Sequence, residues 1–359
     1  MPLGKISYIC SFDINFNITI YANQQNFLGG VVLTILLSAC SPKVSYHQNS
    51  TPEESGLSLM KITDESVSVV GGSTSSTLYG SVSDITAAGI CTNAGFTWSA
   101  TRLLDISPDG SELAYLSWQD KVWNIMVRRS GPQGAATQRT FRQVLDFSWG
   151  NDNKLYFGDA TQENRIQISS TDAYVGSLMR QHTNNNFDMH PVLSNDGKRL
   201  YFTRVDKSGA FVWSYELETG ALTACCRGFN PCPIGDGSSE FICVRNSSHG
   251  TSELWHINYD KAQETLILTD KNRGFTNPQV SPDGQWILCQ GNSKSSISKK
   301  NNLDIFVVKF DGTSFLQLTY HPANDCCPVW SEDGKFIYFI SSRAASNDSY
   351  NIWKMRFDL

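Results

Sequence analysis

The chain has 359 residues, of which 40% are hydrophobic and 11% aromatic, enough apolar side chain for one large core or two ordinary ones. Its formal net charge is −5 and it has no dense tract of lysine and arginine, which argues against a nucleic-acid backbone as partner. Charged residues make up only 18% of the chain, beside 27 glycines, a composition typical of a loop-rich and strand-rich protein.

An uncharged apolar stretch, FLGGVVLTILLSA, occupies residues 27–39. Its 13 residues are too few to span a bilayer as a helix, but they match the apolar core of a signal peptide. The stretch runs into the sequence LSAC at 37–40, which resembles a bacterial lipobox. The resemblance implies a signal peptide over 1–39 and a lipid-modified Cys40 as the mature N-terminus.

The residues after Cys40 predict where the mature protein resides. Residues 40–57 are polar and would tether the lipid to a domain over 58–359. Ser41, rather than Asp, follows the cysteine, which by resemblance to enterobacterial sorting favours the outer membrane. We therefore expect a protein anchored in the bacterial outer membrane and facing the periplasm, with the cell surface as an open alternative.

Cysteine usage agrees with an envelope location and leaves the pairing open. Of the ten cysteines, Cys10 falls in the signal peptide and Cys40 carries lipid, and the remaining eight include the adjacent pairs Cys225-Cys226 and Cys326-Cys327. An oxidising compartment permits disulfides among them. No C-x-x-C spacing occurs, so a zinc ribbon is not indicated.

A short turn motif recurs along the chain. Ser-Pro-Asp-Gly or a close variant ends at Gly110, Gly197, Gly284 and Gly334, with weaker copies at 148–157 and Gly237. Proline sets φ at the first central position and glycine accepts positive φ, so each copy predicts a tight turn between two strands. A period of roughly 40–50 residues is typical of propeller blades or solenoid repeats.

Each repeat is predicted to hold four short antiparallel strands, because runs such as RLYFTRV, AFVWSYEL and GALTA follow one another between turns. The fold class is therefore all-β, a β-propeller of four-stranded blades, with six blades expected and seven as the alternative. Residues 58–66 resemble the strand that the last repeat lacks, so an N-terminal strand is predicted to close the ring. Residues 67–100 are interpreted as a divergent blade or an insertion.

These units resemble the propeller repeats of the TolB family. The matching residues are the turn sequences SPDG at 107–110, SNDG at 194–197, SPDG at 281–284 and SEDG at 331–334, with LDIFVVKFDG at 303–312. The resemblance covers roughly 101–359 and implies a propeller of a kind found in periplasmic assembly proteins, peptidase-linked propellers and pectin-fragment lyases. Residues 41–100 are too short and too rich in Ser and Gly for the additional α/β domain of TolB, so its role with Tol-Pal partners is not implied.

Candidate site residues are polar side chains at the start of the innermost strands, where propellers bind ligands. No G-x-S-x-G, H-E-x-x-H or Walker sequence competes with them. The predicted ligand-binding residues at the channel mouth are Asp105, Asp146, Asp188, His190, Asn230, Asn277 and Asp325. Such a set can hold a polyol or a divalent cation, or it can simply solvate a polar channel.

The absence of a complete catalytic set favours a non-enzymatic envelope module that recognises a protein or glycan partner and needs no cofactor. The alternative is a metal-dependent carbohydrate lyase or hydrolase, in which His190 and Asp188 hold a divalent metal, with His321 nearby. A carboxylate or imidazole base there would remove the proton next to a uronate carboxyl group.

Overall fold

The described part of the chain is built almost entirely of strands. The computed structural model describes residues 51–54, 56–63, 102–119, 122–132, 134–162, 165–176, 178–184, 187–235, 239–294, 301–343 and 350–358. Within these ranges lie 24 strands, forming six four-stranded antiparallel sheets, and one 3-10 helix, η1 (Pro52–Glu54). The predicted signal peptide, Cys40 and residues 67–100 lie outside the described residues.

Each sheet is one blade, and its strands follow one another from the ring axis outward. Blade 1 contains β2 (Leu104–Ile106), β3 (Glu112–Gln119), β4 (Val122–Arg129) and β5 (Thr137–Gln138). Blade 2 contains β6 (Val144–Trp149), β7 (Lys154–Asp159), β8 (Gln167–Asp172) and β9 (Arg180–Gln181). Blade 3 contains β10 (Asp188–Leu193), β11 (Arg199–Asp206), β12 (Gly209–Glu216) and β13 (Leu222–Arg227).

The other three blades repeat this arrangement. Blade 4 contains β14 (Phe229–Pro233), β15 (Glu240–Asn246), β16 (Ser252–Asn258) and β17 (Gln263–Leu268). Blade 5 contains β18 (Phe275–Val280), β19 (Trp286–Lys294), β20 (Asn301–Lys309) and β21 (Leu316–Gln317). Blade 6 contains β22 (Asp325–Trp330), β23 (Phe336–Ser341), β24 (Asn351–Arg356) and β1 (Met60–Lys61).

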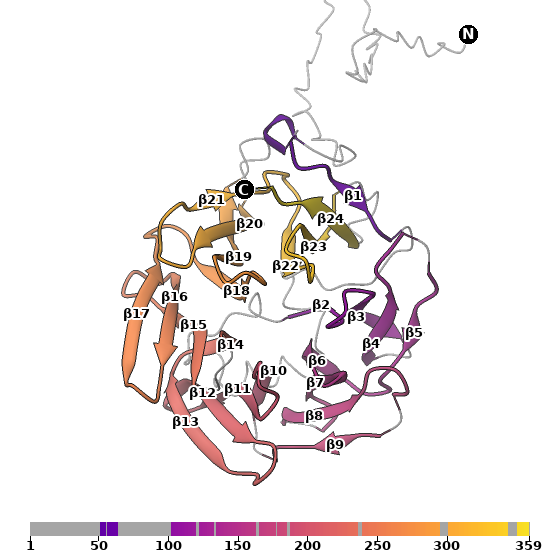
Figure 1. The fold of residues 1–359 in the computed structure, drawn as a ribbon, viewed down its shortest axis with the longest axis vertical. Helices are drawn as coiled ribbons and strands as arrows, with labels where there is room; N and C mark the ends of the chain where they lie inside the picture. Colours follow the sequence, from indigo (N-terminus) through magenta and orange to yellow (C-terminus); the bar gives the residue numbers. More distant parts are fainter. Residues whose placement is uncertain are drawn as a thin grey trace, which may run out of the picture. The chain divides into compact units, whose positions relative to one another are not determined.

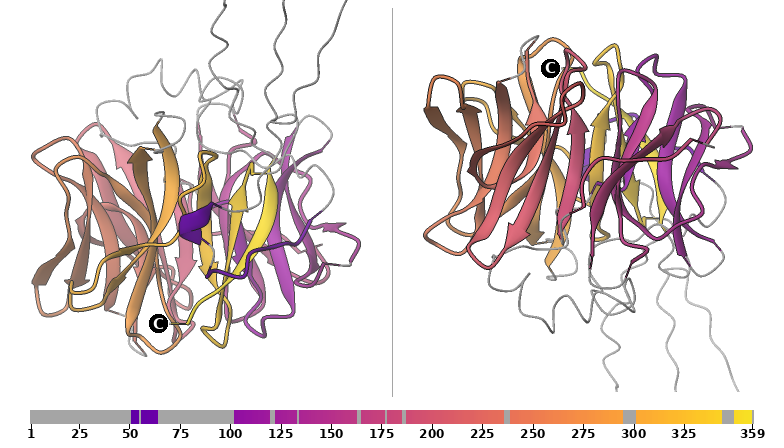
Figure 2. Two further views of the ribbon diagram at one scale, coloured as in Figure 1. Left: turned by 90° about the horizontal axis from the view of Figure 1, so that it is seen from above. Right: turned by 90° about the horizontal axis from the view of Figure 1, so that it is seen from below.

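The six blades close into a ring (Figure 1), which confirms the expected all-β, six-bladed propeller. The innermost strands contact one another in the order β2, β6, β10, β14, β18 and β22, and β22 in turn contacts β2. Figure 2 shows the blades standing side by side around the axis, with their strands running along it.

The predicted N-terminal closing strand is also confirmed. β1 pairs with β24, with Lys61 opposite Trp353, and the N–H of Ile62 donates to the Ile352 carbonyl at 2.8 Å. The Thr63 hydroxyl accepts from the Ile352 N–H and donates to the Asn351 side chain, both at 3.0 Å. The first and last described strands of the chain therefore share one sheet, so that blade 6 has its fourth strand.

The recurring turn sequence has a structural explanation in its own hydrogen bonds. In the turns that begin at Ser107, Ser194, Ser281 and Ser331, the serine hydroxyl donates to the Asp two residues later at 2.6 Å. The glycine that follows has a positive φ of 68–73°. The weaker copy in blade 2 places Asn153 there instead, with φ of 60°, which asparagine tolerates better than most residues. The side chains of the motif thus stabilise the turn itself.

Apolar side chains fill the space between blades, and the largest buried ones include Trp353, Phe275, Phe306 and Phe339. The outermost strands are mostly short, but β13 and β17 have six residues each and are largely exposed. No helix among the described residues is long and apolar enough to cross a membrane.

The closing strand gives a stability prediction. Ile62→Ala should lower the free energy of unfolding by about 2–4 kcal/mol, because Ile62 is buried in the core beside β24. Met60→Ala is the matched control, since Met60, on β1 two residues before Ile62, is half exposed and the loss of its side chain should cost less than about 0.5 kcal/mol. Urea denaturation followed by tryptophan fluorescence measures both, and equal effects would contradict a closing role for β1.

Candidate functional site

The predicted site residues gather where the innermost strands begin, around the ring axis. Asp146, Asp188, His190, Asn230, Asn277 and Asp325 are all buried, and Asp105 is partly buried. The structure thus places all seven on β2, β6, β10, β14, β18 and β22.

A bulge recurs at the start of these strands. In blades 2 to 6 the register of the innermost strand shifts against the second strand, for example between Met189 and Val192. The residue before the proline in blades 3 to 6 has a positive φ of 51–56°; these residues are His190, Asn230, Asn277 and Cys327. Because a bulged residue leaves the ladder, its N–H needs another acceptor.

A side chain from the preceding blade accepts each of these N–H groups. Asp146 Oδ2 accepts from the N–H of His190 at 2.6 Å, and Asn230 Oδ1 accepts from that of Asn277 at 2.6 Å. Thr203 Oγ1 accepts from Asn230 at 3.0 Å, and Gln290 Oε1 accepts from Cys327 at 2.7 Å.

Blade 1 makes a related contact with blade 2. Asp105 Oδ2 accepts the N–H of Trp149 at 2.8 Å, while its Oδ1 accepts from Ile106 at 2.9 Å. Asp105, Asp146 and Asn230 therefore join neighbouring blades. Thr203 on β11 and Gln290 on β19, which the sequence did not point to, also join neighbouring blades, although they lie on the second strand of their blade.

Asp146 and His190 form the centre of this network. Nδ1 of His190 lies 3.0 Å from the Thr203 hydroxyl, which also accepts the Asn230 N–H. Nε2 of His190 lies 3.6 Å from Asp146 Oδ2. A Cβ at position 158 would lie 2.6 Å from Asp146 Oδ1, so only glycine there leaves room for the carboxyl group.

Burial controls the charges at this point. It raises the pKa of Asp146 to about 7 and lowers the pKa of His190 to about 3. Arg102, a buried residue that sequence reasoning missed, opposes the rise at Asp146 and adds to the fall at His190 through its positive charge. At neutral pH the imidazole is therefore uncharged, and the carboxyl group is partly protonated.

Asp188 has a different partner from its neighbour His190. Both of its oxygens accept from the Arg204 guanidinium, at 2.7 and 2.9 Å, and that guanidinium lies over the Trp213 ring at 4.7 Å. No group of three or more His, Cys, Asp or Glu side chains in the described part of the chain is arranged to hold a metal ion. Of the predicted donor pair, Asp188 is paired with Arg204, and Nδ1 of His190 lies 3.0 Å from the Thr203 hydroxyl.

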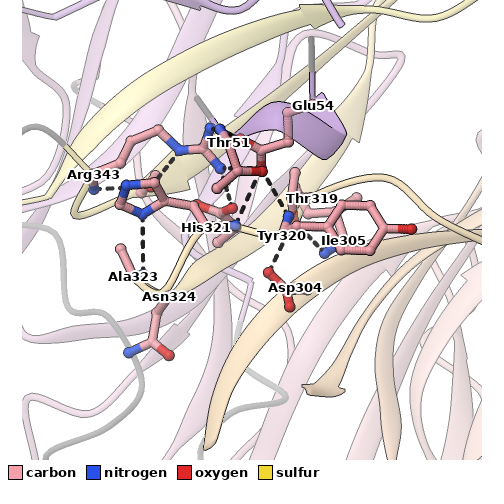
Figure 3. Close-up of polar contacts among 12 residues, drawn as sticks. Thr51, Glu54, Asp304, Ile305, Thr319, Tyr320, His321, Ala323, Asn324 and Arg343 are labelled. Atoms are coloured by element: carbon pink, nitrogen blue, oxygen red, sulfur yellow. Dashed lines mark hydrogen bonds and ion pairs between the residues drawn. The ribbon is translucent and has the colours of Figure 1, made fainter. Parts of the chain in front are cut away.

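Asp325, at the equivalent position of blade 6, also pairs with an arginine. Arg343 hydrogen-bonds to Asp325 Oδ2 and to both oxygens of Glu54, at 3.1 and 3.2 Å, and all three side chains are fully buried. Figure 3 shows Glu54 on η1 reaching the connection before β22, where it accepts the N–H groups of Tyr320 at 2.8 Å and His321 at 3.2 Å. This cluster fastens the segment before β1 to the propeller.

Asp304 lies beside this cluster. Burial, with the negative charges of Asp325 and Glu54, raises the pKa of Asp304 to about 8. Its oxygens accept from the side chains of Gln317 at 3.0 Å and Thr319 at 3.3 Å. His321 Nδ1 accepts the Ala323 N–H at 3.1 Å, so this imidazole also serves local structure.

A second candidate site is an apolar surface, which we call the β8–β9 loop and define by residues 173–176, 178 and 179. Tyr174, Val175, Leu178 and Met179 are 48, 70, 80 and 39% exposed. Asp172 Oδ1 accepts the N–H groups of Tyr174 and Val175 at 2.9 and 2.8 Å, and Arg139 of the first blade's connection donates to the Ala173 carbonyl at 2.5 Å. The loop is thus held in place while its apolar side chains face solvent.

No family model matches the chain, and no curated protein matches it. Among solved structures it is similar to a putative TolB from Agrobacterium tumefaciens, with a TM-score of 0.53 and 16% identity over 72% of this chain and 90% of that one. It is also similar to TolB from Acinetobacter baumannii, with a TM-score of 0.55 and 13% identity.

The chain has a TolB-type propeller fold. It covers 90% of the Agrobacterium protein but only 65% of the Acinetobacter protein, less than two thirds of that chain. An oligogalacturonate lyase from Vibrio parahaemolyticus also matches, with a TM-score of 0.46 and 11% identity over 72% of this chain and 89% of that one.

The buried Asp146 gives a prediction about pH. Between pH 3.8, its ordinary pKa, and about 7, the folded protein holds a proton on Asp146 that the unfolded chain has released, so the contribution of Asp146 to stability falls as the pH rises. Asp146→Asn keeps an acceptor for the His190 N–H and removes this titration. The free energy of unfolding of this variant, relative to that of the wild type, should therefore rise between pH 4 and 7 by on the order of 3 kcal/mol. Above pH 7 the difference between the two proteins should level off.

Asp146→Ala is the control, because it removes the acceptor altogether. This variant should be destabilised over the whole pH range, by about 1–3 kcal/mol, since the His190 N–H loses its partner. Urea denaturation at each pH gives both comparisons. Parallel pH profiles for the wild type and Asp146→Asn would show that burial does not shift this carboxyl group.

Proposed function

We propose that this TolB-type propeller is a non-enzymatic binding or assembly module of the bacterial envelope, and that its partner is a protein held at the β8–β9 loop. The single observation that carries the proposal is the group of exposed apolar side chains at Tyr174, Val175, Leu178 and Met179. Several exposed apolar side chains close together on one loop are the kind of feature that marks an interaction surface.

The polar residues of the axis support this choice of surface. Asp105, Asp146 and Asn230 accept N–H groups of neighbouring blades, while Asp188 and Asp325 bind arginines. Side chains that hold a scaffold together are not available to turn over a substrate without loss of stability. No arrangement of the described side chains favours a carbohydrate lyase or hydrolase, so we do not propose one.

The loop is also suited to binding because it is already ordered. Tyr174 packs edge-on against Trp149, with ring centroids 6.4 Å apart, and its hydroxyl lies 3.4 Å from Asn153 Oδ1. Gly176 has a positive φ of 67°, and a Cβ there would lie 2.9 Å from the Arg139 carbonyl oxygen. A rigid surface loses less conformational entropy when a partner binds.

The chemistry of the loop favours a protein over a glycan. Three of its four exposed large side chains are aliphatic or thioether groups, which pack into the apolar centre of protein interfaces. Sugars bind instead on flat aromatic faces, and Tyr174 alone offers one, half of it covered.

Site-specific photocrosslinking in the native host tests the proposed surface. A photoreactive residue in place of Leu178 should yield a discrete protein adduct, whereas the same residue in place of Leu222, an exposed leucine on β13, should not. Val175→Asp should reduce the Leu178 adduct severalfold by placing a charge in the apolar contact. No adduct at 178, equal adducts at both positions, or an adduct with a polysaccharide would each overturn the proposal of a protein partner.

The envelope location is the other part of the proposal, and it rests on the lipobox-like sequence at 37–40. A lipid on Cys40 would hold the propeller at the outer membrane by its N-terminal tether. Cys40→Ser should therefore move the protein from the membrane fraction to the soluble fraction. A change of Cys232 to Ser controls for loss of a cysteine as such, and a membrane-bound Cys40→Ser protein would contradict the anchor.

A further inference from the structure

Two cysteines meet at the boundary between blades 3 and 4. Cys226 lies on β13, the outermost strand of blade 3, and is half-buried, whereas Cys243 lies on β15 of blade 4 and is buried. Both side chains belong to one apolar cluster with Tyr201, Val212 and Phe241. The boundary between the two blades therefore brings both thiols into the same buried cluster.

The backbone between the two strands brings the sulfurs together. Gly228 follows Cys226 by two residues, and a Cβ at Gly228 would lie 3.0 Å from the Cys243 sulfur. Its φ of 144° lies in the region that favours glycine, so the chain turns there directly over Cys243. The end of β13 therefore passes close to the Cys243 side chain.

Arg245 completes the cluster and ties both blades to it. Its guanidinium binds both Glu264 oxygens at 2.8 Å, and its Nε donates to the Arg227 carbonyl of blade 3 at 2.8 Å. The same group interacts with the Cys226 thiol. A positive charge beside a half-buried thiol favours its thiolate.

The two thiols differ in acidity in the way that a reacting pair requires. The interaction with Cys243 and the charge of Arg245 lower the pKa of Cys226, whereas burial raises the pKa of Cys243. Burial also raises the pKa of the adjacent Cys225 to about 12, and its thiol interacts with Ser214. Cys226 is also half-buried whereas Cys243 is buried, so a disulfide donor reaches Cys226 more readily, which suits Cys226 to the role of nucleophile and Cys243 to that of resolving partner.

We propose that Cys226 and Cys243 form a redox site, which a disulfide donor converts into a covalent link between blade 3 and blade 4. The link would fasten β13, a long and exposed outer strand, to the neighbouring blade. Only the source of the oxidant depends on the proposed envelope location, where disulfide donors are present. The site itself is independent of the proposed partner.

The reaction is a thiol–disulfide exchange in two steps. The Cys226 thiolate attacks a donor R–S–S–R, which gives the mixed disulfide Cys226–S–S–R and an R–S⁻ that takes up the proton Cys226 had lost. Cys243 then attacks the Cys226 sulfur, and its proton leaves with the second R–S⁻ as R–SH. Two protein thiols are oxidised to one disulfide, and the donor is reduced to two thiols.

Peptide mapping of the purified full chain tests the site directly. The reduced protein is incubated with oxidised glutathione, its remaining thiols are blocked with N-ethylmaleimide, and it is digested with trypsin. Cleavage after Lys207, Arg227 and Arg245 places Cys226 in peptide 208–227 and Cys243 in peptide 228–245. We expect these two peptides to be joined by a disulfide that reduction breaks.

Single substitutions identify the cysteines that react, since the two peptides also contain Cys225 and Cys232. The link should persist in Cys225→Ser and in Cys232→Ser and be lost in both Cys226→Ser and Cys243→Ser. Because Cys243 is buried, Cys226→Ser and Cys232→Ser together decide the outcome should Cys243→Ser fail to fold. A link that survives in Cys226→Ser, a Cys225–Cys226 disulfide alone, or complete labelling by N-ethylmaleimide after incubation would each overturn the proposal.

Discussion

The ring depends on one repeated contact, in which a side-chain oxygen of one blade accepts the N–H of a bulged residue in the next. The bulge at the start of the innermost strand removes that N–H from its own sheet, and a buried N–H without an acceptor costs about 1–3 kcal/mol. Asp146, Thr203, Asn230 and Gln290 supply the acceptors between successive blades from blade 2 to blade 6. Blades 2 to 5 thus each accept an N–H that the bulge of the next blade leaves without a partner in its own sheet, which fixes these neighbouring blades relative to each other.

The same contacts explain the charge distribution at the axis. Carboxyl groups there are buried, so they are either shifted toward the protonated form, as at Asp146, or paired with arginine, as at Asp188 and Asp325. The polar side chains around the axis therefore serve mainly to hold the blades together. The proposed binding surface lies away from this centre, at the β8–β9 loop, where the side chains of Val175, Leu178 and Met179 are exposed.

Local sequence could predict the turns, strands and closing strand because these depend on neighbours in the chain. Ser281, Asp283 and Gly284 build their turn among themselves, and the pattern of residues 58–66 matched the strand missing from the last blade. The positions of the polar residues at the start of the innermost strands were also predictable, since Pro191, Pro231 and Pro278 mark where these strands begin. Their hydrogen-bond partners were not predictable, because Asn277 donates to Asn230, which lies 47 residues earlier in the chain.

The missed residues have the same explanation. Arg102, Arg343 and Glu54 carry no motif, and Glu54 reaches Arg343 from 289 residues away only because the ring closes. The amino-acid sequence by itself determined the blade and its turns, since hydrophobic alternation and turn chemistry act over a few residues, whereas it left six or seven blades open. Only the tertiary structure decided which polar side chains face another blade, which thiols meet and which apolar side chains stay uncovered, because those outcomes depend on how separate sheets pack around a common axis.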